Sequence, residues 1–316
     1  MEIFDNNLGQ IDEASVDDRL RISSVPNRSY DPVAFEQFLE AARWRNRVRY
    51  VEVALASNLA DCQFMRFLPA AESLLLSGKR VQSIGGIELA TKLWNLTVSG
   101  DKKNRIDLAG LQASRVSSLR IENPRTEDIR SINQSKQIND LHILNGEFQA
   151  FAQLDSLKLK SLGIAKSSLE EINDLDKLAA VESLVIAGCR RLKSFTRDAD
   201  NVANFRIESC PLFIADSIAR LRKARRVWVL GCKSAFRFNA LGALDELEEL
   251  TITNTGVVVD DTTISGFSRL RKLWISPAKE ATIQKVSEQC PKARVCNGSA
   301  TYIGGVKQAT MQAFYE

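Results

Sequence analysis

Short apolar segments recur along most of the chain at intervals of about 22 residues. Each contains a branched or aromatic apolar residue, here called the anchor, with further apolar residues three positions before it and two positions after it. We assign the anchors to Val51, Leu74, Leu96, Leu119, Leu141, Leu157, Leu184, Phe205, Val227, Leu250 and Leu273. All 33 of these positions are apolar, although hydrophobic residues make up only 44% of the sequence. Alternation at period two around each anchor predicts a short strand with one buried face.

The spacing of the anchors indicates a small structural unit that is stacked many times. The steps between anchors are 21 to 23 residues, except for a step of 16 before Leu157 and a step of 27 after it. These two steps together span 43 residues, which is close to two ordinary steps. We therefore interpret Leu157 as a displaced anchor in an otherwise regular array.

The repeats resemble leucine-rich repeats, whose pattern is LxxLxLxxNxL or LxxLxLxxCxL. Residues 202–212 fit this pattern position by position, and residues 247–257 fit it except at Thr255. The resemblance covers roughly residues 48–278, with a weak twelfth unit around residues 293–298. It implies an α/β solenoid, namely a curved array with a parallel sheet on the concave side. Short helical, 3-10 or irregular segments would form the convex side.

Cys189, Cys210 and Cys232 each stand five positions after an anchor. The leucine-rich repeat family holds Asn or Cys at this position, directed inward where the strand turns away, so the resemblance implies an interior ladder. Three neighbouring thiols could also form a metal or redox site, but no His or fourth ligand accompanies them and the sequence has no CxxC motif. We therefore expect structural thiols, with no metal and no cofactor.

The two ends of the chain depart from the repeat. Residues 31–46, DPVAFEQFLEAARWRN, begin with an Asp-Pro start signal and predict an amphipathic helix. Because the ends of a solenoid expose apolar faces, we assign residues 1–46 to an N-terminal segment with a capping helix. Residues 47–278 form the solenoid of about 11 units, and residues 279–316 form a C-terminal cap and tail, with a last helical arm at AKEATIQKVSEQC. The sequence does not decide whether residues 19–22 form a strand, or whether the C-terminal tail folds over the concave face.

The chain offers little chemistry for catalysis. The net charge of +4 is mild, and no apolar run of about 18 residues predicts a membrane span. No signal peptide is visible at the start, so we expect a cytoplasmic protein with reduced thiols. The one histidine, His142, follows an anchor and should face solvent, and no nucleophile, phosphate-loop or metal-protease motif is present. These features predict that the protein is not an enzyme.

The strand residues that point away from the core are the candidates for binding a partner. Trp228 and Trp274 each follow an anchor and should stand on the concave face two strands apart, roughly 10 Å. A tryptophan that faces solvent contributes little to folding, and Trp and Arg are enriched in interface hot spots. The candidate partner-binding residues are Trp228, Trp274, Arg206, Arg226, Glu208, Leu230, Glu249 and Lys272.

Together these features favour a non-catalytic module that binds another protein through the concave face, makes no membrane contact and is monomeric when free. By resemblance we favour a bacterial immunity protein that neutralises a cognate toxin by direct binding. A scaffold, adaptor or regulatory subunit is the alternative. Nucleic-acid binding through the basic cluster at residues 220–226 is disfavoured, because Leu221 and Ala224 fall on buried frame positions and leave the charges in solvated positions between them.

Overall fold

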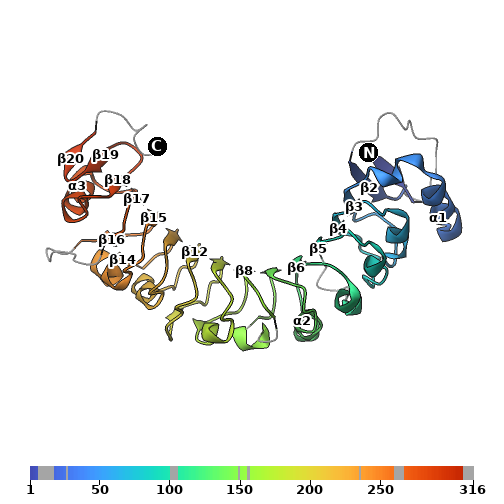
Figure 1. The fold of residues 1–316 in the computed structure, drawn as a ribbon, viewed down its shortest axis with the longest axis horizontal. Helices are drawn as coiled ribbons and strands as arrows, with labels where there is room; N and C mark the ends of the chain where they lie inside the picture. Colours follow the sequence, from blue (N-terminus) through green and yellow to red (C-terminus); the bar gives the residue numbers. More distant parts are fainter. Residues whose placement is uncertain are drawn as a thin grey trace. The chain divides into compact units, whose positions relative to one another are not determined.

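The computed structural model describes residues 1–5, 18–25, 28–99, 106–148, 150–154, 157–234, 236–259 and 267–308. The chain divides into two compact units. Unit 1 comprises Met1–Glu147 with Gln153–Leu159, and unit 2 comprises Phe148–Ala152 with Lys160–Glu316. In each unit, successive strands lie side by side in a sheet, and short helices and turns lie on the other side of the core (Figure 1).

Unit 1 contains seven parallel strands in chain order among its described residues. They are β1 (Glu2–Phe4), β2 (Arg19–Ser23), β3 (Tyr50–Val53), β4 (Ser73–Leu76), β5 (Asn95–Ser99), β6 (Ser118–Glu122) and β7 (Asp140–Leu144). The connecting segments form α1 (Pro32–Ala41), α2 (Thr126–Asn133) and 3-10 turns at Arg43–Asn46, Gln63–Phe67, Ile87–Leu89 and Ala109–Ala113. The unit is therefore a stack of strand-and-turn repeats.

Unit 2 continues the same plan and closes with a hairpin. Its parallel strands are β8 (Ser161–Ala165), β10 (Ser183–Ala187), β12 (Asn204–Glu208), β13 (Arg226–Leu230), β15 (Glu249–Thr253), β17 (Lys272–Ser276) and β18 (Arg294–Cys296). The antiparallel strands β19 (Thr301–Ile303) and β20 (Val306–Lys307) follow β18. The weak twelfth repeat is thus a strand of the sheet, but its predicted frame on Ala293, Cys296 and Gly298 is wrong by one residue, because Val295 and not Cys296 lies opposite Leu273.

The return segments of unit 2 are short, as the sequence predicts. They contain β9 (Glu171–Ile172) paired with β11 (Ser194–Phe195), β14 (Phe236–Arg237) paired with β16 (Val257–Val258), and 3-10 turns at Leu175–Lys177, Ala215–Arg220 and Phe238–Ala243. A further 3-10 turn covers Phe151–Leu154, and α3 spans Glu280–Gln289. Apolar residues spaced by three, such as Ile218 and Leu221, are fully buried, which is the spacing that a 3-10 turn places on one side.

Strand register confirms the repeat frame in both units. Leu184, Phe205, Val227, Leu250 and Leu273 lie opposite one another in successive strands. Every anchor in a strand is at most 3% exposed, and so is every residue two positions later. Alternate residues therefore fill one core under each sheet, and the residues between them form what is here called the open face.

One predicted anchor is wrong. Leu162, and not Leu157, lies opposite Leu184 in β8, so the steps around it are 21 and 22 residues. Leu157 and Leu159 precede the strand, and the outward positions of this repeat are Gly163 and Ala165. The sequence alone could not identify this anchor, because apolar residues alternate both in Leu157-Lys-Leu159 and in Leu162-Gly-Ile164. Strand pairing shows that the second segment belongs to the sheet.

The N-terminal helix also occupies a different place from the one expected. Asp31 caps α1 by accepting hydrogen bonds from the backbone N–H groups of Val33 and Ala34, as the start signal predicts. However, β2 and β1 precede α1 and extend the sheet beyond β3. The helix is therefore the return segment between β2 and β3, and the strand at residues 19–22, which the sequence left undecided, is present as β2.

The strands of unit 2 end in a repeated backbone conformation. The residue four positions after the anchor has a left-handed φ of 50 to 64° at five successive strand ends: Lys166, Gly188, Ser209, Gly231 and Asn254. Each of these residues donates its backbone N–H to the last carbonyl of the next strand at 2.7 to 2.8 Å. Glycine adopts this conformation without strain, which explains the small residues at this position.

Candidate protein-binding surface

All eight residues predicted to bind a partner lie together on the open face of unit 2. They come from four neighbouring strands, β12, β13, β15 and β17. Arg206 lies opposite Trp228, Trp228 opposite Thr251, and Thr251 opposite Trp274. The two tryptophans are therefore two strands apart with Thr251 between them, as the spacing of the anchors predicts.

The buried residues on either side of each tryptophan fix its direction. Val227 and Val229 are both 0% exposed, so the pleat directs Trp228 away from the core. Trp228 and Trp274 are partly exposed. A Cβ atom added to Gly298 would lie 3.5 Å from the Trp274 ring, so the segment after β18 flanks this ring closely. Gly298 thus lies beside Trp274, while residues 309–316 lie outside the described part of the chain.

Charged residues surround the tryptophans in an alternating arrangement. Arg226 lies opposite Glu249, and Glu249 lies opposite Lys272. The Arg226 guanidinium is 3.8 Å from the Glu249 carboxylate. Within β12, an Arg206 Nη2 lies 2.8 Å from a Glu208 Oε2. Such exposed pairs contribute little to folding stability, so the arrangement matters for the pattern of charge that it presents to solvent.

Sequence reasoning left out residues that the structure adds to this surface. Thr251 and Thr253 lie between the tryptophan strands, and their positions one and three after Leu250 predict that they face outward, although they are not among the predicted partner-binding residues. Gly298 was predicted to belong to the weak twelfth repeat, and only the structure places it beside Trp274.

The other aromatic and titratable candidates lie elsewhere. Trp44 is 2% exposed and packs beside Phe38, whereas Trp94 is 50% exposed in unit 1. His142 is partly exposed on the open face of unit 1, as its position after an anchor predicts. Its Nε2 lies 3.3 Å from an Asp140 Oδ1. His142 is therefore not part of the predicted surface.

Comparisons with known proteins identify the architecture. No family model matches the sequence, and a search of curated proteins found no match. Among solved structures, an internalin (InlF) from Listeria monocytogenes has a TM-score of 0.52 at 15% identity, covering 90% of this chain and 87% of that chain. The Toll–Spätzle complex of Drosophila has a TM-score of 0.54 at 12% identity, covering 88% and 42%. A TLR13–ssRNA13 complex has a TM-score of 0.52 at 13% identity, covering 87% and 37%.

The parallel strands in register, the short return segments and these structural neighbours agree. The chain has the leucine-rich repeat fold. At 12 to 15% identity the likeness establishes the fold, and it leaves the ligand to be argued from the surface of this protein.

The leucine-rich repeat ladder holds the cysteines as predicted. Cys189, Cys210 and Cys232 are free and 0% exposed, and Ser167 and Thr255 occupy the same position in the flanking repeats. The thiol–thiol contact lowers the pKa of Cys189 and raises that of Cys210, and burial raises the pKa of Cys232. In the described part of the chain, no group of three His, Cys, Asp or Glu side chains is arranged to hold a metal ion.

The basic cluster is partly neutralised by neighbouring repeats, because its five cations face three carboxylates, Asp198, Glu246 and Glu249. Arg220 and Arg222 both lie within 3.4 Å of Asp198 carboxylate oxygens, and Arg225 lies 3.4 Å from Glu246. Leu221 and Ala224 are 0% exposed, as the repeat frame predicts. The arginines thus occupy solvated positions between buried residues. None of the helices within the described ranges is long and apolar enough to cross a membrane.

Proposed function

We propose that this leucine-rich repeat protein is a non-catalytic binding module that recognises another protein through the open face of β12, β13, β15 and β17. The observation that carries this proposal is the pair Trp228 and Trp274, partly exposed on one face and separated by Thr251. The core beneath is already complete without them, because the anchors and their partners fill it. Aromatic anchors within a rim of paired charges are typical of protein interfaces.

The structural neighbours include a complex with a protein ligand, that of Toll with Spätzle, and a complex of TLR13 with single-stranded RNA. The aromatic pair on the face of the sheet favours a protein partner for this chain. Each arginine of the basic cluster has a carboxylate within 3.8 Å, which weakens its attraction for a phosphate backbone.

The finer proposal is an immunity protein of bacterial type, which neutralises a cognate toxin by occupying its active or activation surface. It rests on the family resemblance together with a large face of mixed charge. A cytoplasmic location and a monomeric free state belong to this proposal, and the six free, buried thiols support the reducing location. A scaffold, adaptor or regulatory subunit is the alternative, and it would use the same face.

The test is affinity capture from the source cells with the wild type and with a Trp228→Ala/Trp274→Ala variant, followed by binding measurements with the purified partner. Truncating two interface tryptophans costs about 2 kcal/mol or more each, so we expect affinity to fall at least about 100-fold. Trp94→Ala is the matched control, because it removes an exposed tryptophan from unit 1.

Three results would test the binding surface and distinguish the immunity function from the scaffold function. A partner that is lost with the double variant and kept with Trp94→Ala supports the surface. Inhibition of that partner's enzymatic activity by the wild-type protein supports the immunity function, whereas a partner whose activity is unchanged supports the scaffold. Equal affinity of the double variant and the wild type would contradict the proposed surface.

A further inference from the structure

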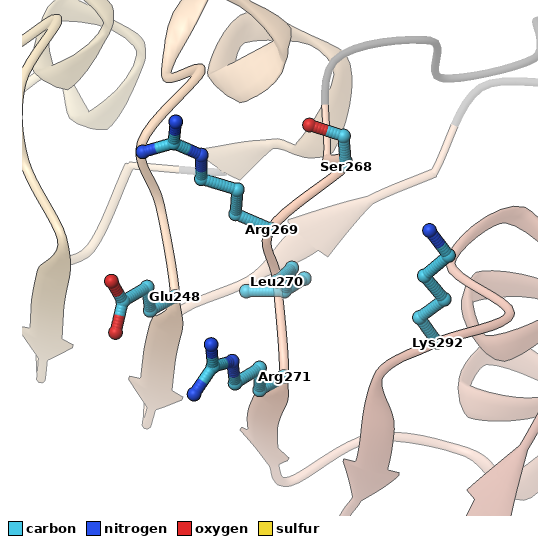
Figure 2. Close-up of a pocket in the computed structure, with 6 residues that line it drawn as sticks. All are labelled: Glu248, Ser268, Arg269, Leu270, Arg271 and Lys292. Carbon is cyan, nitrogen blue, oxygen red and sulfur yellow. The ribbon is translucent and has the colours of Figure 1, made fainter.

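A cavity of about 470 Å³ opens at the edge of the unit 2 sheet, where three successive parallel strands begin. It is lined by Glu248, Ser268, Arg269, Leu270, Arg271 and Lys292. These residues belong to the segments that lead into β15, β17 and β18 (Figure 2), and none of them is among the eight predicted partner-binding residues. Leu270 is 1% exposed and forms an apolar wall.

The pocket carries an excess of positive charge. Arg269, Arg271 and Lys292 are exposed to solvent, and Glu248 is the one carboxylate that lines the cavity. None of the three cations forms an ion pair with another residue whose position is described. Three positive charges against one negative charge leave a net of two positive charges in the pocket.

The repeat frame explains why these charges are not neutralised. Two repeats earlier, Arg225 stands two positions before its anchor and pairs with Glu246, which stands four positions before the next anchor. Arg271 stands at the position of Arg225, two before Leu273. The position that corresponds to Glu246 is then Pro291, four before Val295, which carries no charge. The repeat that would supply the neutralising carboxylate thus has a proline at that position, beside this cavity.

The backbone under the pocket is held in place by the sheet. The Arg271 N–H donates to the Glu248 carbonyl at 2.8 Å, and the Arg294 N–H donates to the Arg271 carbonyl at 2.8 Å. Adjacent strands place the bases of these side chains about 4.8 Å apart. Binding therefore orders only the side chains and not the chain that supports them, which lowers the entropic cost of binding.

We infer that this pocket binds the phosphate group of a phosphate monoester. The Arg269 and Arg271 guanidinium groups lie on the Glu248 side of the 268–271 segment, and the Lys292 ammonium group lies on its other side (Figure 2). Together with the Ser268 hydroxyl they line the cavity with charge-assisted donors, and Arg matches the geometry of phosphate oxygens. The net of two positive charges matches a phosphate monoester dianion, whereas a single carboxylate would leave one charge uncompensated. The volume lies within the range of small-ligand pockets, so the Leu270 wall can contact the organic part. This inference does not depend on the proposed protein-binding surface.

The test is isothermal titration calorimetry of the full chain with glycerol 3-phosphate, inorganic phosphate and acetate. The Arg269→Gln/Arg271→Gln variant removes two donors from the pocket, and Lys292→Gln removes the third cation. The control is Arg220→Gln/Arg222→Gln, which makes the same charge change at arginines that are already paired with Asp198. We expect one site on the wild type and a loss of affinity of about 10-fold or more per pocket arginine, with the control within about twofold.

The pH dependence gives an independent readout. The second pKa of a phosphate monoester is about 6, so lowering the pH from 7.5 to 5 converts the ligand to a monoanion and should weaken binding about 10-fold. Acetate that binds as tightly as glycerol 3-phosphate, equal losses in the pocket and control variants, or no binding to the wild type would each overturn the inference.

The source of the phosphate is decided by two further probes, free phosphoserine and a phosphoserine-containing peptide. Equal affinity for both assigns the pocket to a phosphorylated small molecule. Affinity for the peptide that is about 10-fold or more higher assigns it to a phosphorylated protein. Both results support phosphate recognition, and both require that the Arg269→Gln/Arg271→Gln variant weakens binding.

Discussion

The two units share the left-handed residue four positions after the anchor, which Asn123 and Asn145 provide in unit 1, but they differ in the side chain that follows it. In unit 2, five successive repeats place a small polar or thiol side chain five positions after the anchor, at Ser167, Cys189, Cys210, Cys232 and Thr255. Each cysteine Sγ lies within 4.0 Å of a carbonyl oxygen two residues earlier. In unit 1, the same position holds Ala56, Lys79, Pro124 or Gly146 at the strand ends that the structure describes.

In unit 1, a single buried carboxylate accepts hydrogen bonds from the segments that follow the first strands. Asp5 follows β1 and is 1% exposed. It accepts hydrogen bonds from the Ser57 hydroxyl at 2.9 Å and the Asn58 backbone N–H at 2.6 Å, both after β3, and from the Ser24 hydroxyl after β2. One residue thus connects three strand ends. In unit 2, each strand end has its own side chain at the fifth position, so replacing one of these residues should destabilise only the neighbouring repeats. Replacing Asp5 should destabilise three repeats at once.

The largest expected effect follows from Asp5→Ala. The substitution leaves buried donors at Ser57 and Asn58 without an acceptor, so we expect the free energy of unfolding of unit 1 to fall by about 2–4 kcal/mol. Hydrogen exchange measured by mass spectrometry should show loss of protection at β1, β2 and β3, with unit 2 unchanged. Asp5→Asn keeps one acceptor oxygen and should lose less. Unchanged exchange around Ser57 would contradict the role of this carboxylate.

A smaller effect is expected from Thr255→Val in the ladder. The Thr255 hydroxyl accepts from the Cys232 backbone N–H at 3.1 Å and donates to the Thr253 carbonyl at 3.2 Å. Valine keeps the volume but leaves a buried N–H unsatisfied, so we expect a loss of about 1–3 kcal/mol measured by urea unfolding. Loss of exchange protection should stay within β13, β15 and their return segments. Loss that spread through all of unit 2 would show that the rungs are not independent.

The smallest effect is expected from Cys210→Ser. The hydroxyl can keep the contact with the Glu208 carbonyl, which the Cys210 Sγ makes at 3.4 Å, but it is smaller and more polar than the thiol it replaces. We expect a loss of about 1 kcal/mol in urea unfolding and unchanged affinity for the protein partner. Loss of partner binding at an unchanged melting temperature would mean that the ladder has a role in binding.

The sequence predicted much of the fold because it depends on local alternation. In a strand, neighbouring residues point to opposite faces, so the apolar Val227 and Val229 predict a buried face and place Trp228 on the other. The tryptophan surface could therefore be predicted from the sequence. Leu162 shows where this reasoning fails. Two overlapping alternations were available, and pairing with Leu184 selected one of them. Lys166 then adopts the left-handed conformation that small residues or Asn hold elsewhere, which no local preference predicts.

By itself, the sequence of this protein determined which residues are buried, how often the unit repeats and which side chains face outward, because each follows from a period of two within a period of about 22 residues. The tertiary structure alone decided the contacts between residues distant in the chain. Asp5 meets Asn58 across 53 positions, and Arg271 and Lys292 approach the same cavity from different repeats. Such contacts depend on strand register, and register is set by the packing of whole repeats against one another.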